Sequence, residues 1–221
     1  MSWGAVRLVV MTRIPAILLV GPTGSGKTPL GDYLELRGLW GRRCVHFDFG
    51  AQLRAIAEGR RIAAELTEEQ IAVVVRSLGT GALLENEHFA IAAGILRSFA
   101  DQRRIAADDR MVLNGLARHI GQARDVDQIV AVSAVVSLEC SAEVVYERIR
   151  LDSGGDRAGR TDDDLAAVAR KLKLFAQRTV PLLEHYRSLR TPVHGVKVSV
   201  ATGPEDIWTD LSRRLQSESP S

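Results

Sequence analysis

The sequence predicts an α/β fold in which a five-stranded parallel sheet is covered by helices on both faces. Short, continuous apolar runs recur along the chain, and such runs are typical of strands that are buried on both faces. Helical patterns separate these runs, and regular alternation of strand and helix implies a parallel sheet. We expect strands at 15–20, 44–49, 111–113, 129–138 and 193–200.

The expected helices depart from strict alternation in two places. Residues 58–90 hold helical patterns and no strand, so we expect an inserted helical lobe there. Residues 151–161 are rich in glycine and charge and cannot bury much apolar surface, which favours a mobile flap. Helical patterns lie at 27–38, 50–58, 67–78, 85–104, 119–126, 141–150, 163–189 and 204–216.

The composition is that of a globular protein of 221 residues, of which 46% are hydrophobic. The formal net charge is only +2 and the basic residues are spread along the chain, so we expect no nucleic-acid partner. Cys44 and Cys140 lack the spacing of a disulfide framework or a cysteine zinc site. The early apolar run at 14–20 is too short to span a bilayer, and we find no signal-peptide pattern. We therefore expect a cytoplasmic protein with no membrane partner, in which residues 1–10 are a possible extension.

The strongest local signal is the segment from Gly21 to Thr28, which matches the phosphate-binding pattern G-x-x-x-x-G-K-[ST]. It follows an expected strand and precedes an expected helix, as the motif requires. Its glycines let the backbone curl so that successive N–H groups point at phosphate oxygens, and the helix adds its positive end. Lys27 would reach the transferring phosphates, and the Thr28 hydroxyl would ligate Mg²⁺. The expected nucleotide contacts are Gly21, Pro22, Thr23, Gly24, Ser25, Gly26, Lys27 and Thr28.

This P-loop predicts nucleotide binding within a three-layer P-loop NTPase sandwich, but it does not name a reaction. ATPases, GTPases, small-molecule kinases and prenyltransferases all use such a loop. A chain of 221 residues leaves little room for a motor or transporter ATPase. The residues beyond the loop must therefore identify the substrate.

Four further segments, in order, resemble the adenylate kinases. Gly50-Ala-Gln-Leu-Arg54 resembles the family's Gly-Asp-x-Leu-Arg, and residues 81–84 resemble the segment that lies along the AMP adenine. Residues 113–123, Leu-Asn-Gly-Leu-Ala-Arg-His-Ile-Gly-Gln-Ala, resemble Leu-Asp-Gly-Phe-Pro-Arg-x-x-x-Gln-Ala. Residues 147–172 contain Glu-Arg, Gly-Arg-Thr-Asp-Asp and Arg-Lys-Leu, which resemble the family's lid and the basic pair that follows it. With the tail, the resemblance covers about residues 15–216.

The resemblance implies one kinase domain, residues 1–221, that moves the γ-phosphoryl group of Mg·ATP to AMP. Within it we expect an AMP-binding lobe at about 50–90 and a short lid without zinc at about 148–162. The core would consist of residues 12–49, 91–147 and 163–216. The family-level expectation for the assembly is a monomer.

The resemblance also implies roles for individual side chains. Arg54 and Arg118 would hold the acceptor phosphate, because the planar guanidinium binds phosphate in a bidentate way. Arg148 would stack on the ATP base, and Gln122 would read the adenine of AMP. The expected catalytic residues are Lys27, Arg118, Arg160, Arg170 and Lys171. The expected AMP contacts are Gly50, Arg54, Leu84, Gly115, Arg118 and Gln122. The expected Mg²⁺ contacts are Thr28 and, through bound water, Asn114.

The chain departs from the family pattern at several of these positions. Asn114 replaces an Asp, which keeps an acceptor oxygen but loses the charge, and Asp48 at the end of the second strand is the candidate substitute. Phe49 replaces a Thr near the acceptor base, so acceptor specificity is expected to loosen. Asp152 stands where a second lid arginine is expected, with Arg150 or Arg157 as replacements.

Three functional interpretations follow. The first is AMP phosphorylation, with UMP, CMP or another small molecule as a variant acceptor. The second is a tRNA prenyltransferase, which has a similar loop, although the chain is short for that role. The third is a degenerate nucleotide-binding regulatory protein, which Asn114 and Asp152 would favour. The five histidines have no ligand or triad spacing, and we expect no catalytic role for them.

Overall fold

The computed structural model describes residues 13–60, 66–80, 84, 86–155 and 165–216. Its centre is a five-stranded sheet in the order β2-β3-β1-β4-β5, in which every neighbouring pair is parallel. This confirms the predicted α/β class and the five-stranded parallel sheet. The strands are β1 (Ile14–Val20), β2 (Cys44–Asp48), β3 (Arg110–Asn114), β4 (Val130–Glu139) and β5 (Val193–Lys197).

The central strand β1 shows why the apolar runs form strands. It pairs with β3 on one side and β4 on the other, and its residues from Ala16 to Val20 are buried. A strand with helices over both faces has no polar face, so its apolar residues are continuous instead of alternating. Strands β2 and β3 pair in parallel and end at the same level, which places Asp48 opposite Asn114.

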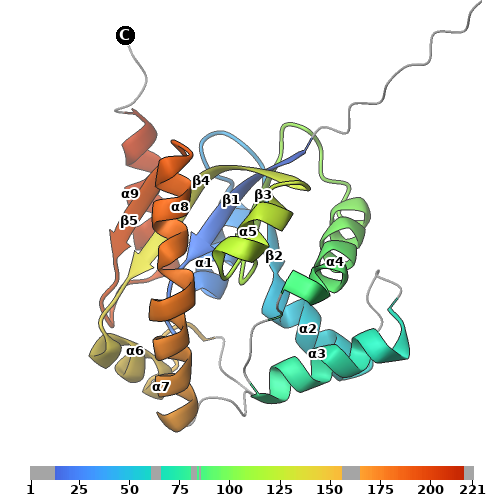
Figure 1. Ribbon diagram of the computed structural model, residues 1–221. Helices are drawn as coiled ribbons and strands as arrows, with labels where there is room; N and C mark the ends of the chain where they lie inside the picture. The colour runs from blue at the N-terminus through green and yellow to red at the C-terminus, as the bar shows by residue number, and fades with distance from the viewer. Residues whose placement is uncertain (1–12, 61–65, 81–83, 85, 156–164, 217–221) are drawn as a thin grey trace, which may run out of the picture.

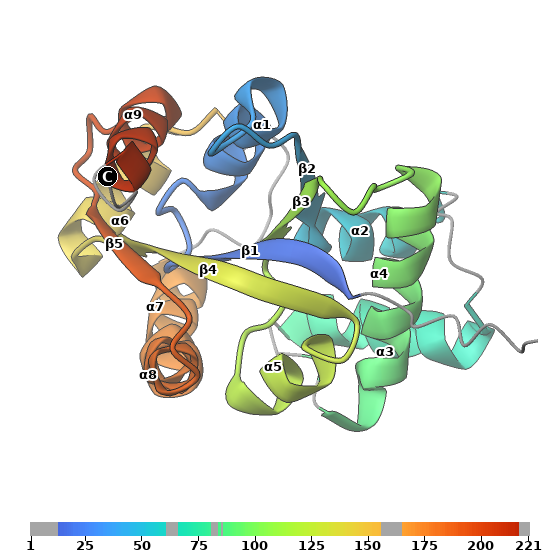
Figure 2. The same cartoon turned by 90° about the horizontal axis from the view of Figure 1, so that it is seen from above.

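Helices cover both faces of the sheet (Figure 2). On one face, α1 (Lys27–Arg37) and α9 (Pro204–Gln216) contribute leucines and Ile207 to a buried apolar cluster with β1 and β4. On the other face, α4 (Phe89–Gln102), α5 (Ile120–Val126) and α8 (Pro181–Ser188) pack in a second, larger cluster. The helices thus cover both faces of the sheet and leave its carboxyl edge for the site.

Two groups of helices stand beyond the carboxyl ends of the strands, on opposite sides of the P-loop (Figure 1). One group comprises α2 (Phe49–Ala57), α3 (Glu68–Thr80) and the short η1 (Asn86–His88). The other comprises α6 (Ala142–Arg150), α7 (Leu165–Leu174) and the π-helical turn η2 (Phe175–Thr179). These groups occupy the ranges for which we expected a helical lobe and the surroundings of a lid.

Several boundaries differ from the sequence-based expectations. Phe49 was expected in the second strand but begins α2, because the Asp48 carboxylate accepts a hydrogen bond from Ala51 N at 2.9 Å and caps the helix. The single helix expected over 163–189 is interrupted by η2, and β5 ends at Lys197, three residues early. The helix at 85–104 is preceded by η1 and ends at Gln102.

No helix in the described ranges is both long enough and apolar enough to cross a membrane.

Candidate active site

The P-loop connects β1 to α1 and its backbone curls at two glycines. Gly24 and Gly26 have positive φ angles of 74° and 94°, a region that favours glycine. A Cβ at Gly26 would lie 3.0 Å from Nη2 of Arg148, and one at Gly21 would lie 2.6 Å from Oγ of Ser25. The residue types of the motif are therefore required by the local geometry as well as by the approach of phosphates.

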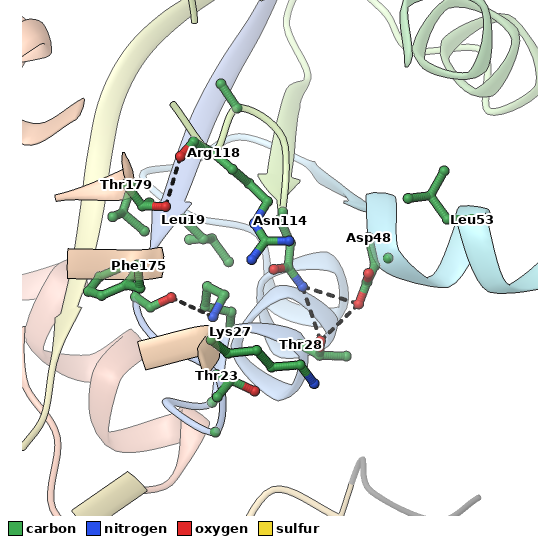
Figure 3. A pocket seen from close by; sticks show the side chains of 18 of the residues that line it. Leu19, Thr23, Lys27, Thr28, Asp48, Leu53, Asn114, Arg118, Phe175 and Thr179 are labelled. Atoms are coloured by element: carbon green, nitrogen blue, oxygen red, sulfur yellow. Dashed lines mark hydrogen bonds between the residues drawn. The ribbon is translucent and has the colours of Figure 1, made fainter. Parts of the chain in front are cut away.

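Lys27 begins α1 and its ammonium folds back over the loop. Its Nζ donates to the carbonyl oxygens of Gly21 and Pro22, both at 2.7 Å. Figure 3 shows the side chain directed into a pocket at the carboxyl edge of the sheet. Since the N-terminal end of α1 also faces this pocket, the loop gathers positive potential at one point.

Thr28, Asp48 and Asn114 form a hydrogen-bonded cluster next to Lys27 (Figure 3). The Thr28 hydroxyl donates to Oδ2 of Asp48 at 2.8 Å, and Nδ2 of Asn114 donates to Oδ2 of Asp48 at 3.2 Å and to Oγ1 of Thr28 at 3.0 Å. The cluster thus presents a hydroxyl, a carboxylate and an amide oxygen at the edge of the pocket. Such hard oxygen donors are the ligands that Mg²⁺ takes, so these residues fit that ion.

One half of the pocket contains two arginines. Arg54 extends from α2 and Arg118 from the loop before α5, and both line the pocket. Neither guanidinium has a hydrogen-bond or ion-pair partner among the described residues. Burial lowers the pKa of Arg118 to about 10, which still leaves it charged at neutral pH. A desolvated cation with no anionic neighbour is stabilised by an incoming anion, so this half of the pocket suits a phosphate.

Gln122 is buried and holds two backbone segments together. Its Nε2 donates to the carbonyl oxygen of Leu84 at 2.6 Å, and its Oε1 accepts from Arg118 N at 2.8 Å. Neither Gln122 nor Leu84 lines the pocket. In this structure the side chain therefore supports the backbone of Arg118 and does not face the space in which a base would lie.

Arg148 is also buried, on α6. Its Nε donates to Gly24 O at 3.0 Å, and its Nη1 donates to the carbonyl oxygens of Ser199 and Thr202 at 2.8 and 2.9 Å. The guanidinium therefore fastens the P-loop to the loop after β5. The N–H groups at the edges of this guanidinium already donate to carbonyl oxygens. Only its flat face would remain for stacking on an ATP base.

The two basic residues expected after the lid, Arg170 and Lys171, point in different directions from α7. Lys171 lines the pocket, whereas Arg170 is exposed on α7 and does not. Arg160 and Arg157 lie outside the described residues. Arg150, the other candidate replacement, is exposed and pairs with Glu147.

The structure brings most of the predicted residues to one pocket and leaves some outside it. Pro22 and Ser25 do not line the pocket, and Ser25 is fully buried. The predicted residues that line the pocket are Gly21, Thr23, Gly24, Gly26, Lys27, Thr28, Gly50, Arg54, Asn114, Gly115, Arg118 and Lys171.

Sequence reasoning missed several pocket residues and misjudged the surroundings of one. Ser77 on α3 and Phe175 and Thr179 on η2 line the pocket, and no motif marks them. Phe49, which we expected near the acceptor base, is buried in the core and stacks on Phe47 with ring centroids 6.1 Å apart. It points away because the capped start of α2 turns it toward the sheet.

The comparisons with known proteins agree with this geometry. A family model described as an AAA domain matches residues 17–168. The adenylate kinase of Parvibaculum lavamentivorans is 28% identical over 210 residues, which is 90% of this chain and 93% of that protein. The adenylate kinase of Stenotrophomonas maltophilia K279a is 31% identical, covering 77% and 84%. That of Rhodopirellula baltica is also 31% identical, covering 77% and 81%.

The P-loop lies at the carboxyl edge of a parallel sheet, in one pocket with two arginines whose guanidinium groups have no partner among the described residues. This arrangement defines the protein as a P-loop kinase, an enzyme that transfers phosphoryl groups. The identity and coverage of the relatives go further: the chain belongs to the adenylate kinase family, as a divergent member. Among solved structures, a gluconokinase from Sinorhizobium meliloti 1021 matches 95% of this chain at 18% identity and a TM-score of 0.48, a likeness too distant to bear on the acceptor.

Proposed function

We propose that this enzyme transfers the γ-phosphoryl group of Mg·ATP to AMP and releases two molecules of ADP. The observation that carries this proposal is the pair of arginines, Arg54 and Arg118, that line the same pocket as the P-loop and whose guanidinium groups have no anionic partner among the described residues. Two phosphate-binding groups on one pocket suit a donor and an acceptor that are both phosphates. Phosphoryl transfer needs such alignment and charge neutralisation more than covalent help.

On the donor side, the P-loop amides and Lys27 would bind the β- and γ-phosphates. The Lys27 ammonium now lies on the carbonyl oxygens of Gly21 and Pro22, within the loop that would surround the phosphates. Moving that ammonium onto a γ-phosphoryl oxygen exchanges neutral acceptors for a charged one, which gives a stronger hydrogen bond. Lys171, which lines the same pocket, would add a second cation near the transferring group.

On the acceptor side, Arg54 and Arg118 would hold the AMP phosphate in line with the donor. The backbone of Arg118 is fixed from two directions, because Gln122 accepts from its N–H and Thr179 donates to its carbonyl oxygen at 2.8 Å. A cation on a fixed backbone loses little entropy on binding, so its position is ready for the transition state. In this reaction the predicted lobe at about 50–90 would bind AMP, and the predicted segment at about 148–162 would serve as the lid.

Thr28, Asp48 and Asn114 are the residues that would hold Mg²⁺, directly or through its waters. When bound, the ion would neutralise charge on the β- and γ-phosphate oxygens. Asp48 supplies the carboxylate that Asn114 lacks, since its Oδ2 lies within hydrogen-bond distance of both other side chains. The substitution at 114 is therefore compensated within the same cluster.

A second candidate is the same reaction with a different monophosphate acceptor. Two specific observations favour it: the amide of Gln122 is engaged with Leu84 and Arg118, and Phe49 is buried in the core. Neither side chain then reads adenine, so the acceptor would be chosen by its phosphate more than by its base.

An acceptor panel tests the proposal. The purified protein is incubated with Mg·ATP and, separately, AMP, UMP, CMP and GMP, and ADP formation is followed. We expect ADP to depend on a nucleoside monophosphate, with AMP turned over fastest. Equal rates with all nucleotides would support the second candidate, and no acceptor-dependent ADP with any nucleotide would contradict both.

A further inference from the structure

The π-helical turn η2 brings two side chains to the pocket that no sequence motif marks. Val180 N donates to the carbonyl oxygen of Phe175 at 2.9 Å, five residues back instead of four, so the turn holds one more residue than an α-helical turn. Such turns are rare inside helices and are often found at functional sites. The place of η2 agrees with that tendency, since Phe175 and Thr179 both line the pocket.

The additional residue places Thr179 on the same side of the helix as Lys171. The two residues are eight positions apart, and in an α-helix of 3.6 residues per turn this spacing rotates the second side chain about 80° away from the first. The wider turn takes up most of that rotation, and both side chains line the pocket. One helical stretch therefore brings a cation to the pocket and, further along, a hydroxyl.

The hydroxyl of Thr179 binds the backbone of Arg118, whose side chain lines the same pocket. Its Oγ1 donates to the carbonyl oxygen of Arg118 at 2.8 Å (Figure 3), and Thr179 is 7% exposed. Gln122 accepts from Arg118 N at 2.8 Å, so side chains engage both polar backbone groups of this arginine. A valine in place of Thr179 would keep the shape but leave the carbonyl without this donor.

Arg118 depends on such support because its guanidinium has no partner among the described residues. Burial lowers the pKa of Arg118 to about 10, so the group is desolvated and still charged at neutral pH. A side chain without a hydrogen-bond partner is placed by its backbone and by packing. A shift of the Arg118 backbone would therefore move the cation with it.

We propose that Thr179 is a positioning residue that, through the carbonyl of Arg118, holds this arginine at a fixed place relative to Lys171. The inference rests on the proposed function, in which Arg118 binds the acceptor phosphate and Lys171 lies near the transferring group. Thr179 acts through Arg118 and not on the phosphates. Because phosphoryl transfer needs donor and acceptor in line, a fixed spacing between these two cations favours the transition state.

Three variants separate positioning from packing. Thr179→Val removes the hydroxyl and keeps the branched shape, whereas Thr179→Ser keeps the hydroxyl and removes the methyl group. Thr209→Val makes the same chemical change on α9, at a residue that does not line the pocket, and is the matched control. A packing role would make the serine variant the more damaging of the two at Thr179, and a positioning role predicts the reverse.

The first measurement is nitrogen NMR on the ligand-free protein, which does not depend on catalysis. The amide of His119 shares its peptide plane with the Arg118 carbonyl, so it reports the hydrogen bond, and the Nε–H signal of Arg118 reports the guanidinium. We expect Thr179→Val to move both signals, while Thr179→Ser and Thr209→Val leave them in place. If both signals stay in place in Thr179→Val, the inference is overturned.

The second measurement is steady-state kinetics with each substrate varied in turn. We expect Thr179→Val to raise the KM for AMP about fivefold, the order expected for one lost hydrogen bond, while the KM for ATP changes by less than about twofold. Thr179→Ser should restore most of the loss. A valine variant with an unchanged KM for AMP, or with equal rises for both substrates, would overturn the inference.

The two proposals can fail separately. A wild-type protein that forms no ADP with any nucleoside monophosphate contradicts the proposed reaction, and the NMR signals of Arg118 and His119 in Thr179→Val then decide by themselves whether Thr179 positions the arginine.

Discussion

The cationic side chains at this site differ in how many hydrogen-bond acceptors the protein itself supplies to them. Arg148 donates to backbone carbonyls on two loops, and Lys27 donates to two carbonyl oxygens of its own loop. Arg54 and Arg118 have no described acceptor, although burial lowers the pKa of Arg118. In the proposed reaction, an acceptor phosphate would engage the two arginines that have no partner among the described residues, whereas Arg148 binds other parts of the protein.

Replacing Arg54 tests the acceptor half directly. We expect Arg54→Ala to raise the KM for AMP about 10- to 100-fold, because a charged hydrogen bond to phosphate contributes about 1.5–3 kcal/mol. The KM for ATP should change little, since Arg54 lies on α2, away from the P-loop. Steady-state kinetics with each substrate varied in turn measures both constants. Arg60→Ala, which removes an exposed arginine paired with Glu58, is the control. Equal rises in both KM values would contradict the assignment.

Single residues could be predicted where one position determines the chemistry. Lys27 and Thr28 follow from the P-loop pattern, and Arg54 and Arg118 follow from segments in the family's order. The role of Gln122 could not be foreseen, because its partners are backbone atoms of Leu84 and Arg118 that no side-chain pattern encodes. The hydrogen bond from Thr179 could not be foreseen either, since it joins η2 to the backbone of the loop before α5.

At the scale of elements, Arg148 connects three segments that are far apart in the sequence. It extends from α6 to Gly24 of the P-loop and to Ser199 and Thr202 of the loop after β5. A lysine has one nitrogen and cannot reproduce a fork that donates in several directions. The fold of the phosphate-binding edge therefore depends on an arginine whose family role is nucleotide contact.

We expect Arg148→Lys to lower the free energy of unfolding by about 2–4 kcal/mol, because buried carbonyls and a buried charge would lose partners. Urea denaturation followed by circular dichroism measures the change. Arg150→Lys on the same helix is the control: its guanidinium is exposed and pairs only with Glu147 among the described residues, so we expect little change in stability. If Arg148→Lys is as stable as Arg150→Lys, the bridging role is wrong.

The helices and strands could be predicted wherever the hydrophobic pattern of the sequence was uniform along the element. The continuous apolar run of β1 and the alternation of strands with helices predicted the layers. The π-helical turn η2 was missed, because its residues continue the apolar pattern of α7 and α8. This turn matters, since it brings Phe175 and Thr179 to the pocket.

The whole molecule brings these parts together through its topology. The parallel strands end at one edge, so the P-loop after β1, Asp48 at the end of β2 and Asn114 at the end of β3 meet there. Helices on either side of that edge supply Arg54 and Lys171 (Figure 1). The distribution of donor and acceptor groups over one pocket is the basis of the claim that two phosphate-bearing substrates react here.

Phosphorus NMR of a mixture of ATP, AMP and Mg²⁺ with the enzyme tests that claim most directly. We predict that the γ-phosphate and AMP signals fall together while ADP signals rise, with no inorganic phosphate, and that Lys27→Met is silent whereas Lys173→Met, on the exposed part of α7, behaves as the wild type. Conversion of ATP to ADP and inorganic phosphate with AMP unchanged, or undiminished transfer by Lys27→Met, would contradict it.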